Sequence, residues 1–435
     1  MGFWSKLFGG EKTEKEPETR APEAAPAPGG GKKSPEAAFV EWCLAEIRKH
    51  PDVERAELGE GPSLPVSIWK RGSDGTHTMF LKNTFVETRE LPPADKLAAL
   101  KRLLINVERS GEKRDWHDVI DSFVPLLRAA TFAASIRGDA PPTVTRPFVP
   151  FLSVFLGLDE NERIGYTTQK ELDEWGQSAD TAFAHAFENM QRHVAATSAN
   201  GTDVALYDEH APYPIWHVVS NDSYETSRLV LPGYLASFRG KVAGNPIAIA
   251  PHRSLLVIAG DAEPHAIARL AHMAEKEFQA SPRSVSPAVY TCDEAGHVVP
   301  LRLPPEHPQH QLVERGHYLL ALDIYGEQKT ELEERFQRQS VDVFVASFML
   351  FENDLTKKLT SASTMTQGVP TLLPETDLIV LVSDSMEPLR VPRAVVLELL
   401  PECFAPAPEY FPPRLRVVGW PTPARLVELQ RWATD

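Results

Sequence analysis

A multi-domain α+β fold, with mixed small sheets and packed helices behind a disordered N-terminal tether, is predicted by three features of the sequence. The chain has 435 residues, whereas single hydrophobic cores usually stop growing at about 250–300 residues. Strand-like and helix-like segments follow one another irregularly and include hairpins, which indicates an α+β rather than a doubly wound architecture. Residues 11–33 are rich in Glu, Lys, Pro, Ala and Gly, so we expect a flexible linker that cannot bury enough apolar surface to fold.

Composition narrows the classes of function. Sixty acidic residues against 45 Lys and Arg residues give a formal net charge of −15, which disfavours binding to nucleic acid over a broad surface. The three cysteines, Cys43, Cys292 and Cys403, are far apart. They therefore predict neither a disulfide framework nor a metal or redox pair, and they favour the reducing cytoplasm. Since no run of 18 or more apolar residues occurs, no transmembrane helix is predicted.

The first ten residues are predicted to form a short amphipathic foot. Phe3, Trp4, Leu7 and Phe8 have the spacing of one helical face. Because the linker holds this face away from the folded chain, we expect residues 1–8 to contact a protein partner, or the inner face of the membrane as a peripheral anchor. The alternative is an apolar start that packs loosely or not at all, since eight residues are too few to form a stable helix alone.

An N-terminal α+β domain is predicted at residues 34–142. Ser34 and Pro35 have the N-cap and first-turn positions of a helix. Leucines at helical spacing predict a second helix that extends to about residue 108. Between these helices, apolar segments bounded by turn residues predict strands at residues 53–58, 64–70 and 77–85.

A central α+β domain is predicted at residues 143–300. Thr168 and Ser178 have the N-cap positions of two helices. Helical spacing predicts a further helix at residues 266–278. Apolar runs predict strands at residues 151–156, 164–167, 203–207 and 215–219, and a hairpin of residues 246–250 and 254–260.

A C-terminal α+β domain is predicted at residues 311–435. It follows a segment at residues 300–311 that contains four prolines and is interpreted as a linker. Its first elements are predicted to be a strand at residues 318–324, a charged helix at 327–339 and a strand at 341–350.

A cluster of polar side chains occupies a predicted helix start directly after a predicted strand. Asp222 or Ser223 has the N-cap position, and Glu225 lies in the first turn. One interpretation is structural, with Tyr224 in the core and Arg228 paired with Glu225 at a surface. Because the preceding strand carries this start inward, we expect instead that Arg228 is buried and paired with Asp222.

The other interpretation of the same cluster is an anion-binding pocket at the helix N-terminus. In that pocket Arg128 and Arg228 are cationic clamps, and Asn221 is the orienting amide. The predicted ligand-binding residues are Arg128, Asn221, Asp222, Tyr224 and Arg228. Nothing in the sequence identifies the ligand.

Three segments resemble, in order, segments of the YtpQ-like family of bacterial proteins. They are residues 125–132, 221–229 and 250–261, and the resemblance covers about residues 37–300. The second segment of the family reads N-D-G-Y-(D/E)-x-S-R-(I/L)-L, so Ser223 stands where the family has glycine. If that glycine has a positive φ, serine is strained there. The resemblance implies an unassigned biochemical role, and it makes residues 311–435 an added domain.

Motifs for common catalytic and metal sites do not occur in the sequence. It contains no phosphate-binding loop, no G-x-S-x-G and no H-E-x-x-H. His307 and His310 have the spacing of metal ligands, but no third ligand is near them in the sequence. His185 and His193 lie eight residues apart on one predicted helix, and we expect one solvated and one packed residue. Neither a metal nor a cofactor is predicted.

We therefore expect a cytoplasmic, non-enzymatic binding or scaffold protein that has a protein partner and does not bind nucleic acid. The alternative is an enzyme or ligand-binding protein acting on an anionic small molecule or phosphoester, with Asp222 as base and two arginines holding charge. Geometry separates the two hypotheses. Convergence of Arg128, Asn221, Asp222 and Arg228 on one open pocket favours the alternative, whereas buried pairs favour the scaffold. The sequence does not predict an oligomeric state.

Overall fold

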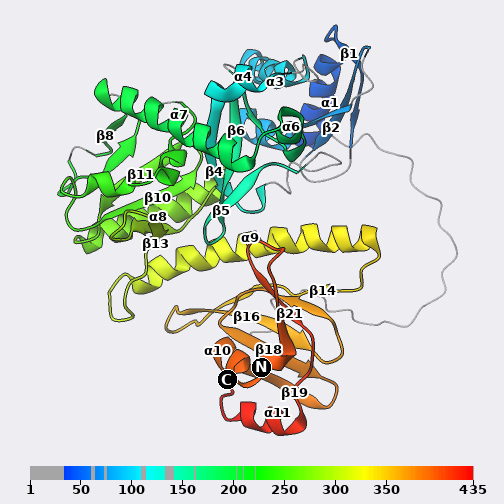
Figure 1. The fold of residues 1–435 in the computed structure, drawn as a ribbon, viewed down its shortest axis with the longest axis vertical. Coiled ribbons are helices and arrows are strands. Elements are labelled where there is room, and N and C mark those ends of the chain that lie inside the picture. The colour runs from blue at the N-terminus through cyan, green and yellow to red at the C-terminus, as the bar shows by residue number, and fades with distance from the viewer. Residues whose placement is uncertain are drawn as a thin grey trace, which may run out of the picture.

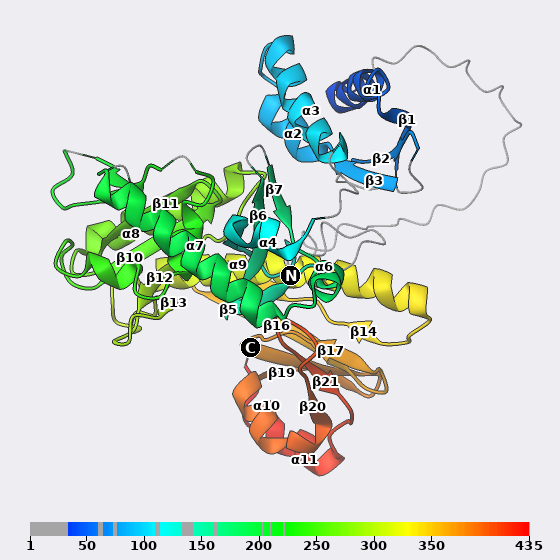
Figure 2. The ribbon, with the colours of Figure 1, turned by 45° about the horizontal axis from the view of Figure 1, so that its top comes forward.

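The computed structural model covers the chain in three groups of elements, shown in Figure 1 and Figure 2. We call them the N-terminal layer (residues 34–108), the central body (114–300) and the C-terminal unit (341–434), and the long helix α9 joins the last two. The predicted foot, the linker at residues 11–33 and Asn221 lie outside the described residues. The structure describes residues 34–59, 64–72, 76–108, 114–132, 142–160, 163–201, 203–208, 210–220 and 222–434.

Helices pack on one small sheet in the N-terminal layer. The Ser34 cap is confirmed, because Ser34 Oγ accepts a hydrogen bond from Ala37 N at 3.2 Å. An antiparallel sheet of order β1-β2-β3 shares a core with the helices that includes Cys43, Ile68 and Leu100. The elements are α1 (Pro35–Ile47), β1 (Val53–Leu58), β2 (Pro65–Lys70), β3 (Thr76–Phe80), α2 (Lys82–Thr88) and α3 (Pro93–Glu108).

The strand predicted at residues 77–85 is wrong in its second half. β3 ends at Phe80, and the helix α2 follows. Thr84 and Thr88 are both buried one helical turn apart, and Thr88 Oγ1 donates to Thr84 O at 2.6 Å. These residues therefore reach the core with the period of a helix and not of a strand.

The first sheet of the central body is built around one long strand. β6 (Leu152–Glu160) pairs antiparallel with β4 (Phe123–Ala129), β5 (Thr145–Val149) and β7 (Arg163–Tyr166). The predicted domain boundary between residues 142 and 143 would separate β4 from β6, to which it is hydrogen-bonded. Both strands therefore belong to the central body. Two short helical turns, α4 (Trp116–Val119) and η2 (Ile120–Ser122), precede the sheet.

Two capped helices follow this sheet, and both predicted caps are confirmed. Thr168 forms a capping box with Glu171 at the start of α6 (Gln169–Trp175). Ser178 Oγ accepts from Thr181 N at 3.1 Å at the start of α7 (Ala179–Ala199). The helix α7 packs against β4.

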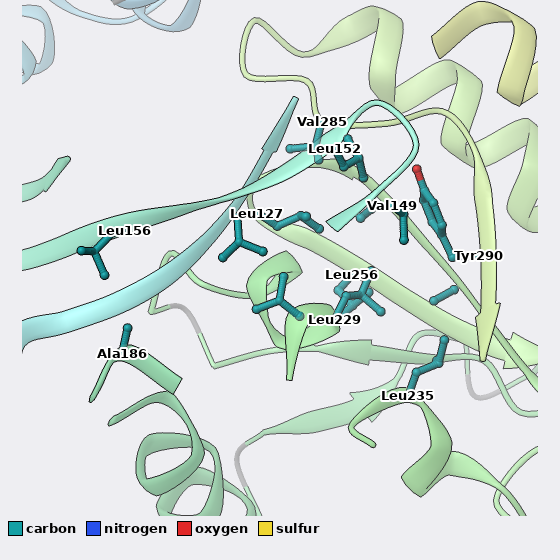
Figure 3. Packing of buried hydrophobic residues seen from close by; sticks show 14 of the residues in the cluster. Leu127, Val149, Leu152, Leu156, Ala186, Leu229, Leu235, Leu256, Val285 and Tyr290 are labelled. Atoms are coloured by element: carbon teal, nitrogen blue, oxygen red, sulfur yellow. The ribbon is translucent and has the colours of Figure 1, made fainter. Parts of the chain in front are cut away.

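A second, six-stranded sheet of order β13-β12-β10-β11-β9-β8 completes the central body, and all its pairs are antiparallel. The predicted hairpin is confirmed as β10 and β11. In Figure 3, Leu127 and Leu156 of the first sheet lie in one apolar cluster with Leu256 of the second sheet and Leu229 between them. The elements are β8 (Val204–Leu206), β9 (Trp216–Val218), β10 (Pro246–His252), β11 (Leu255–Gly260), α8 (Pro264–Ala280), β12 (Val289–Cys292) and β13 (Val298–Pro300).

The helix α9 (His310–Gln339) contradicts the strand predicted at residues 318–324. Leu320 and Ile324 pack into the core of the central body, whereas Tyr325 lies between Phe151 and Phe348. A helix that is buried on two faces loses the single apolar stripe of a surface helix. Its apolar run then looks like a buried strand, which explains the wrong prediction.

The C-terminal unit has two four-stranded sheets, β14-β17-β21-β20 and β15-β16-β18-β19. The strand predicted at residues 341–350 is wrong in extent, because the chain leaves one sheet after β14 and joins the other at β15. The strands are β14 (Phe344–Val345), β15 (Met349–Glu352), β16 (Leu359–Thr366), β17 (Thr371–Leu373), β18 (Leu378–Ser383), β19 (Met386–Pro392), β20 (Phe404–Ala407) and β21 (Arg414–Val417). The helical elements are α10 (Arg393–Leu399), η5 (Pro401–Cys403) and α11 (Pro423–Gln430).

The predicted fold class, a multi-domain α+β protein, is confirmed by these separate sheets and their packed helices. All three cysteines are buried as free thiols. Within the described ranges, no helix is long and apolar enough to cross a membrane. Those same ranges contain no cluster of three or more His, Cys, Asp or Glu side chains that could hold a metal ion.

Candidate functional site

The three segments that carry the family resemblance meet in the central body. Ser227 Oγ accepts a hydrogen bond from Leu127 N at 3.1 Å, which joins the second segment to the first. Thr226 Oγ1 donates to Arg253 O at 3.1 Å, which joins the second segment to the third. Both hydroxyl side chains are fully buried. The polar residues that the sequence singles out therefore surround one structural junction.

The junction is not the start of an α-helix, so that prediction is wrong. The chain forms a tight turn in which Asp222 Oδ1 accepts from Tyr224 N at 2.9 Å, and then the short 3₁₀ helix η3 (Thr226–Val230). Pro232 ends the helical path, because a proline removes a backbone donor and forces the preceding residue to be extended. Leu231 accordingly has φ −72° and ψ 125°. A second 3₁₀ helix, η4 (Leu235–Phe238), follows, and the described chain has no α-helix N-terminus here to bind an anion.

Arg228 is the centre of the junction. Its side chain is fully buried, and its guanidinium donates from Nε to Asp203 Oδ1 at 2.8 Å. It also forms a fork onto Asp222, with Nη1 to Oδ1 at 3.2 Å and Nη2 to Oδ2 at 2.8 Å. The expected buried pair of Arg228 with Asp222 is thus present, and Asp203 is a second carboxylate that the sequence did not predict.

Neighbouring side chains complete the network around the two carboxylates. His193 Nε2 lies 2.7 Å from Asp222 Oδ2, and Tyr234 Oη donates to Asp203 Oδ2 at 3.1 Å. Burial raises the pKa of Asp222, but the Arg228 guanidinium outweighs burial, so the pKa of this carboxyl is lowered to about 2. Burial lowers the pKa of Arg228, but Asp222 and Asp203 outweigh it, and the net direction is upward. Asp222 and Arg228 therefore stabilise each other in their charged forms.

His193, Asp203 and Tyr234 are the members of this network that sequence reasoning missed. They come from α7, from the position just before β8 and from the turn before η4, between 6 and 35 residues from Arg228. No spacing rule links such positions, because their proximity depends on how the sheet and α7 pack. His193 is 41% exposed at its side chain, so it forms the outer end of the network.

Glu225 does not pair with Arg228 in the structure. Its side chain is buried, and its Oε2 has no hydrogen-bond partner among the described residues. Burial raises the pKa of this carboxyl. The predicted surface pair of Glu225 with Arg228 is therefore wrong, because Arg228 turns toward Asp203 and Asp222 instead.

Tyr224 touches the network through its backbone N on Asp222 and its ring against His193, whereas the side chain of Arg128 lies in a separate cluster. Tyr224 packs in an apolar group that includes Leu126 and Phe155, and its hydroxyl donates to Asp159. Arg128 is buried, with Nη1 donating to Leu127 O at 2.7 Å and Nε to Tyr166 Oη at 3.1 Å. Its guanidinium also lies over aromatic rings. No hydrogen bond or ion pair in the described part of the chain joins Arg128 to Asp222 or Arg228.

Cavities lined by described residues lie elsewhere. One of about 590 Å³ opens in the N-terminal layer between α1, α2 and α3. Two others, of about 250 and 310 Å³, lie where β5 and the loop before β6 face the C-terminal unit. The residues that line these three cavities include none of Arg128, Asp222, Tyr224 and Arg228.

The residue at the glycine position of the resemblance has the backbone conformation that glycine favours. Ser223 has φ 67°, and its side chain is exposed. We expect Ser223→Gly to stabilise the protein by about 0.5–1 kcal/mol, because glycine relieves the left-handed strain at a modest entropic cost. Urea unfolding is the measurement. Ser223→Ala is the matched control and should show no gain, and a loss of stability in Ser223→Gly would contradict this account.

Comparison with known proteins finds partial similarity to one curated protein. The chain is 24% identical over 152 residues to "UPF0354 protein lin1649" of Listeria innocua, and the match covers 34% of this chain and 53% of that protein. The chain thus spans about half the length of the curated relative that it matches. No family model matches the chain. No solved structure matches it either.

Proposed function

We propose that this chain is a non-enzymatic binding or scaffold protein of the cytoplasm. The observation that carries the proposal is the complete burial of Arg228 between Asp203 and Asp222. The two carboxylates accept from three of the five N–H donors of this guanidinium, and its complete burial leaves no exposed face for a ligand. In this interpretation the polar cluster fixes the packing of η3 between the two sheets of the central body.

The alternative, an enzyme acting on an anionic small molecule, needs Asp222 as a free base. That carboxylate already accepts hydrogen bonds from Arg228 and from Tyr224 N, and it contacts His193. A base with a pKa of about 2 is also a weak proton acceptor near neutral pH. Arg128 lies in another cluster, so the two proposed clamps do not face one ligand.

The wider assignment follows from the same interpretation. We infer that residues 37–300 form a YtpQ-like body and that the C-terminal unit is an addition to it. The similarity to an uncharacterised bacterial protein over part of the chain supports this inference. We propose that the foot recruits these parts of the chain to a protein partner or to the inner face of the membrane.

Deletion of residues 1–10 tests recruitment. We expect the shortened protein to keep its far-ultraviolet circular dichroism spectrum and to lose co-sedimentation with membranes or with its partner, because Phe3, Trp4, Leu7 and Phe8 supply the apolar contact. Lys6→Ala is the control and should retain most of the binding. Unchanged localisation after the deletion would refute recruitment by the foot.

A further inference from the structure

The cavity of the N-terminal layer is an apolar groove with an aromatic floor. Phe39 lies between Trp42 and Phe85, with ring centroids 5.8 and 5.3 Å apart respectively. Phe39 is buried, whereas Trp42 and Phe85 are half-buried and also line the cavity of about 590 Å³. Figure 2 shows α1 facing α2 and α3, the three helices that form its walls.

The groove has the properties of a docking site for a short amphipathic segment. Its volume lies within the roughly 300–1,000 Å³ that ligand pockets occupy, and its walls are helices, as in grooves that take up one apolar helical face. Aromatic side chains are favoured partners for an aromatic floor, because their rings stack or meet edge to face. Arg89, Glu90 and Lys96 also line it and give it a charged rim.

One segment of matching chemistry is attached to the rim of the groove. Pro35 and Ala38 line the groove, so the chain enters the folded protein at this cavity. Phe3, Trp4, Leu7 and Phe8 are connected to it by about 25 residues. A flexible linker of that length spans roughly 25–30 Å on average, which suffices to bring the segment back to its own point of attachment.

We propose that residues 3–8 of the same chain dock in this groove, with their aromatic side chains on Phe39, Trp42 and Phe85. Tethering gives the segment an effective concentration of about 1 mM at the groove, which a free partner protein does not reach in a cell. Glu90 on the rim is 89% exposed at its side chain, so it offers a carboxylate with which Lys6 can pair. Docking needs only the foot and the groove. Its consequence, that docking withholds the foot from recruitment, rests on the proposed function.

The test is the binding of a synthetic peptide of residues 1–10 to two forms of the protein. We expect saturable binding to the chain that lacks residues 1–10, with a dissociation constant below the roughly millimolar effective concentration. The intact chain should bind the peptide more weakly, because its own foot competes for the groove. The loss is about tenfold if the dissociation constant of the peptide is a tenth of the effective concentration. A peptide of scrambled sequence should not bind.

Two matched substitutions on α1 locate the binding. Ala38 is exposed and lines the groove, so Ala38→Arg should block the peptide without removing a core contact. Ala37 is exposed on the same helix and is not among the residues that line the groove, and its position along the helix turns it away from Phe39 and Trp42. Ala37→Arg should therefore bind as the parent does. Circular dichroism checks that both variants fold.

Several results would overturn the proposal. These are no peptide binding, equal binding to the intact and shortened chains, or equal effects of Ala38→Arg and Ala37→Arg. The intact chain could also prove to be a dimer that becomes a monomer when residues 1–10 are deleted. The foot would then occupy the groove of a second copy, and docking within one chain would be overturned. The two assays are independent. Co-sedimentation of the intact and shortened chains tests recruitment, whereas peptide binding to the shortened chain tests docking, so either proposal can fail without the other.

Discussion

Arg228→Ala is expected to lower the free energy of unfolding by roughly 3–5 kcal/mol, which would appear as poor expression and a strongly lowered melting temperature. The cost arises because the carboxyl groups of Asp203 and Asp222 stay buried without the guanidinium that pairs with both of them. Urea unfolding and the yield of soluble protein measure the effect. Arg228→Lys should recover only part of the loss, because an ammonium group cannot form the same fork.

An exposed arginine of α7 is the control for this change. Arg192 is 69% exposed at its side chain and pairs with Asp121 at the surface, so Arg192→Ala should cost less than about 1 kcal/mol. Addition of Asp203→Asn and Asp222→Asn to Arg228→Ala should restore part of the stability, because no charge is then stranded. If Arg228→Ala left stability unchanged but abolished a ligand-induced thermal shift of the parent protein, the anion-binding alternative would replace the scaffold.

Arg414→Ala is expected to lower the free energy of unfolding by roughly 2–4 kcal/mol, because it leaves several buried acceptors without a donor. Arg414 is buried at the start of β21. It donates to Gln328 Oε1 at 2.6 Å, to Ala346 O at 3.0 Å and to Leu372 O at 3.2 Å. Burial lowers the pKa of this guanidinium to about 10, so it stays charged at neutral pH.

The neighbouring arginine of the same strand is the control for Arg414. Arg416 pairs with Glu409 at 2.6 Å at a partly exposed position, so Arg416→Ala should cost less than about 1 kcal/mol. Urea unfolding followed by tryptophan fluorescence measures both variants. Equal costs for the two substitutions would show that burial and the carbonyl contacts of Arg414 do not matter.

Local signals were the most predictable part of the fold. Ser34, Thr168 and Ser178 were identified as caps because a cap depends on a hydroxyl and a backbone group only three residues away. The strand at residues 53–58 was predicted with its observed bounds. The helix at residues 318–324 was missed because its pattern reflects two different neighbours, the central body and the C-terminal unit, and neither can be known from the local sequence.

The polar junction was predictable only in part. Asp222 and Arg228 are six residues apart, so their pairing follows from a single turn of the chain. Asp203 and His193 reach the same cluster through the packing of β8 and α7, which no local pattern encodes. Ser223 was predictable in part. The resemblance showed that the family has a glycine at this position, but only the structure shows that Ser223 has a positive φ.

The two-sided burial of α9 makes it unsuitable as a hinge. Gly316 allows the helix to lie so close to the chain at Pro287 that a Cβ atom there would come within 2.6 Å of Pro287 O. Nine residues later on the same helix, Tyr325 Oη donates to Pro413 O at 2.9 Å in the C-terminal unit. The helix is therefore held on both sides by packing and hydrogen-bond contacts. A fragment cut before residue 310 would expose an apolar flank that α9 covers, so an independently expressed central body should aggregate rather than persist as a free-standing module.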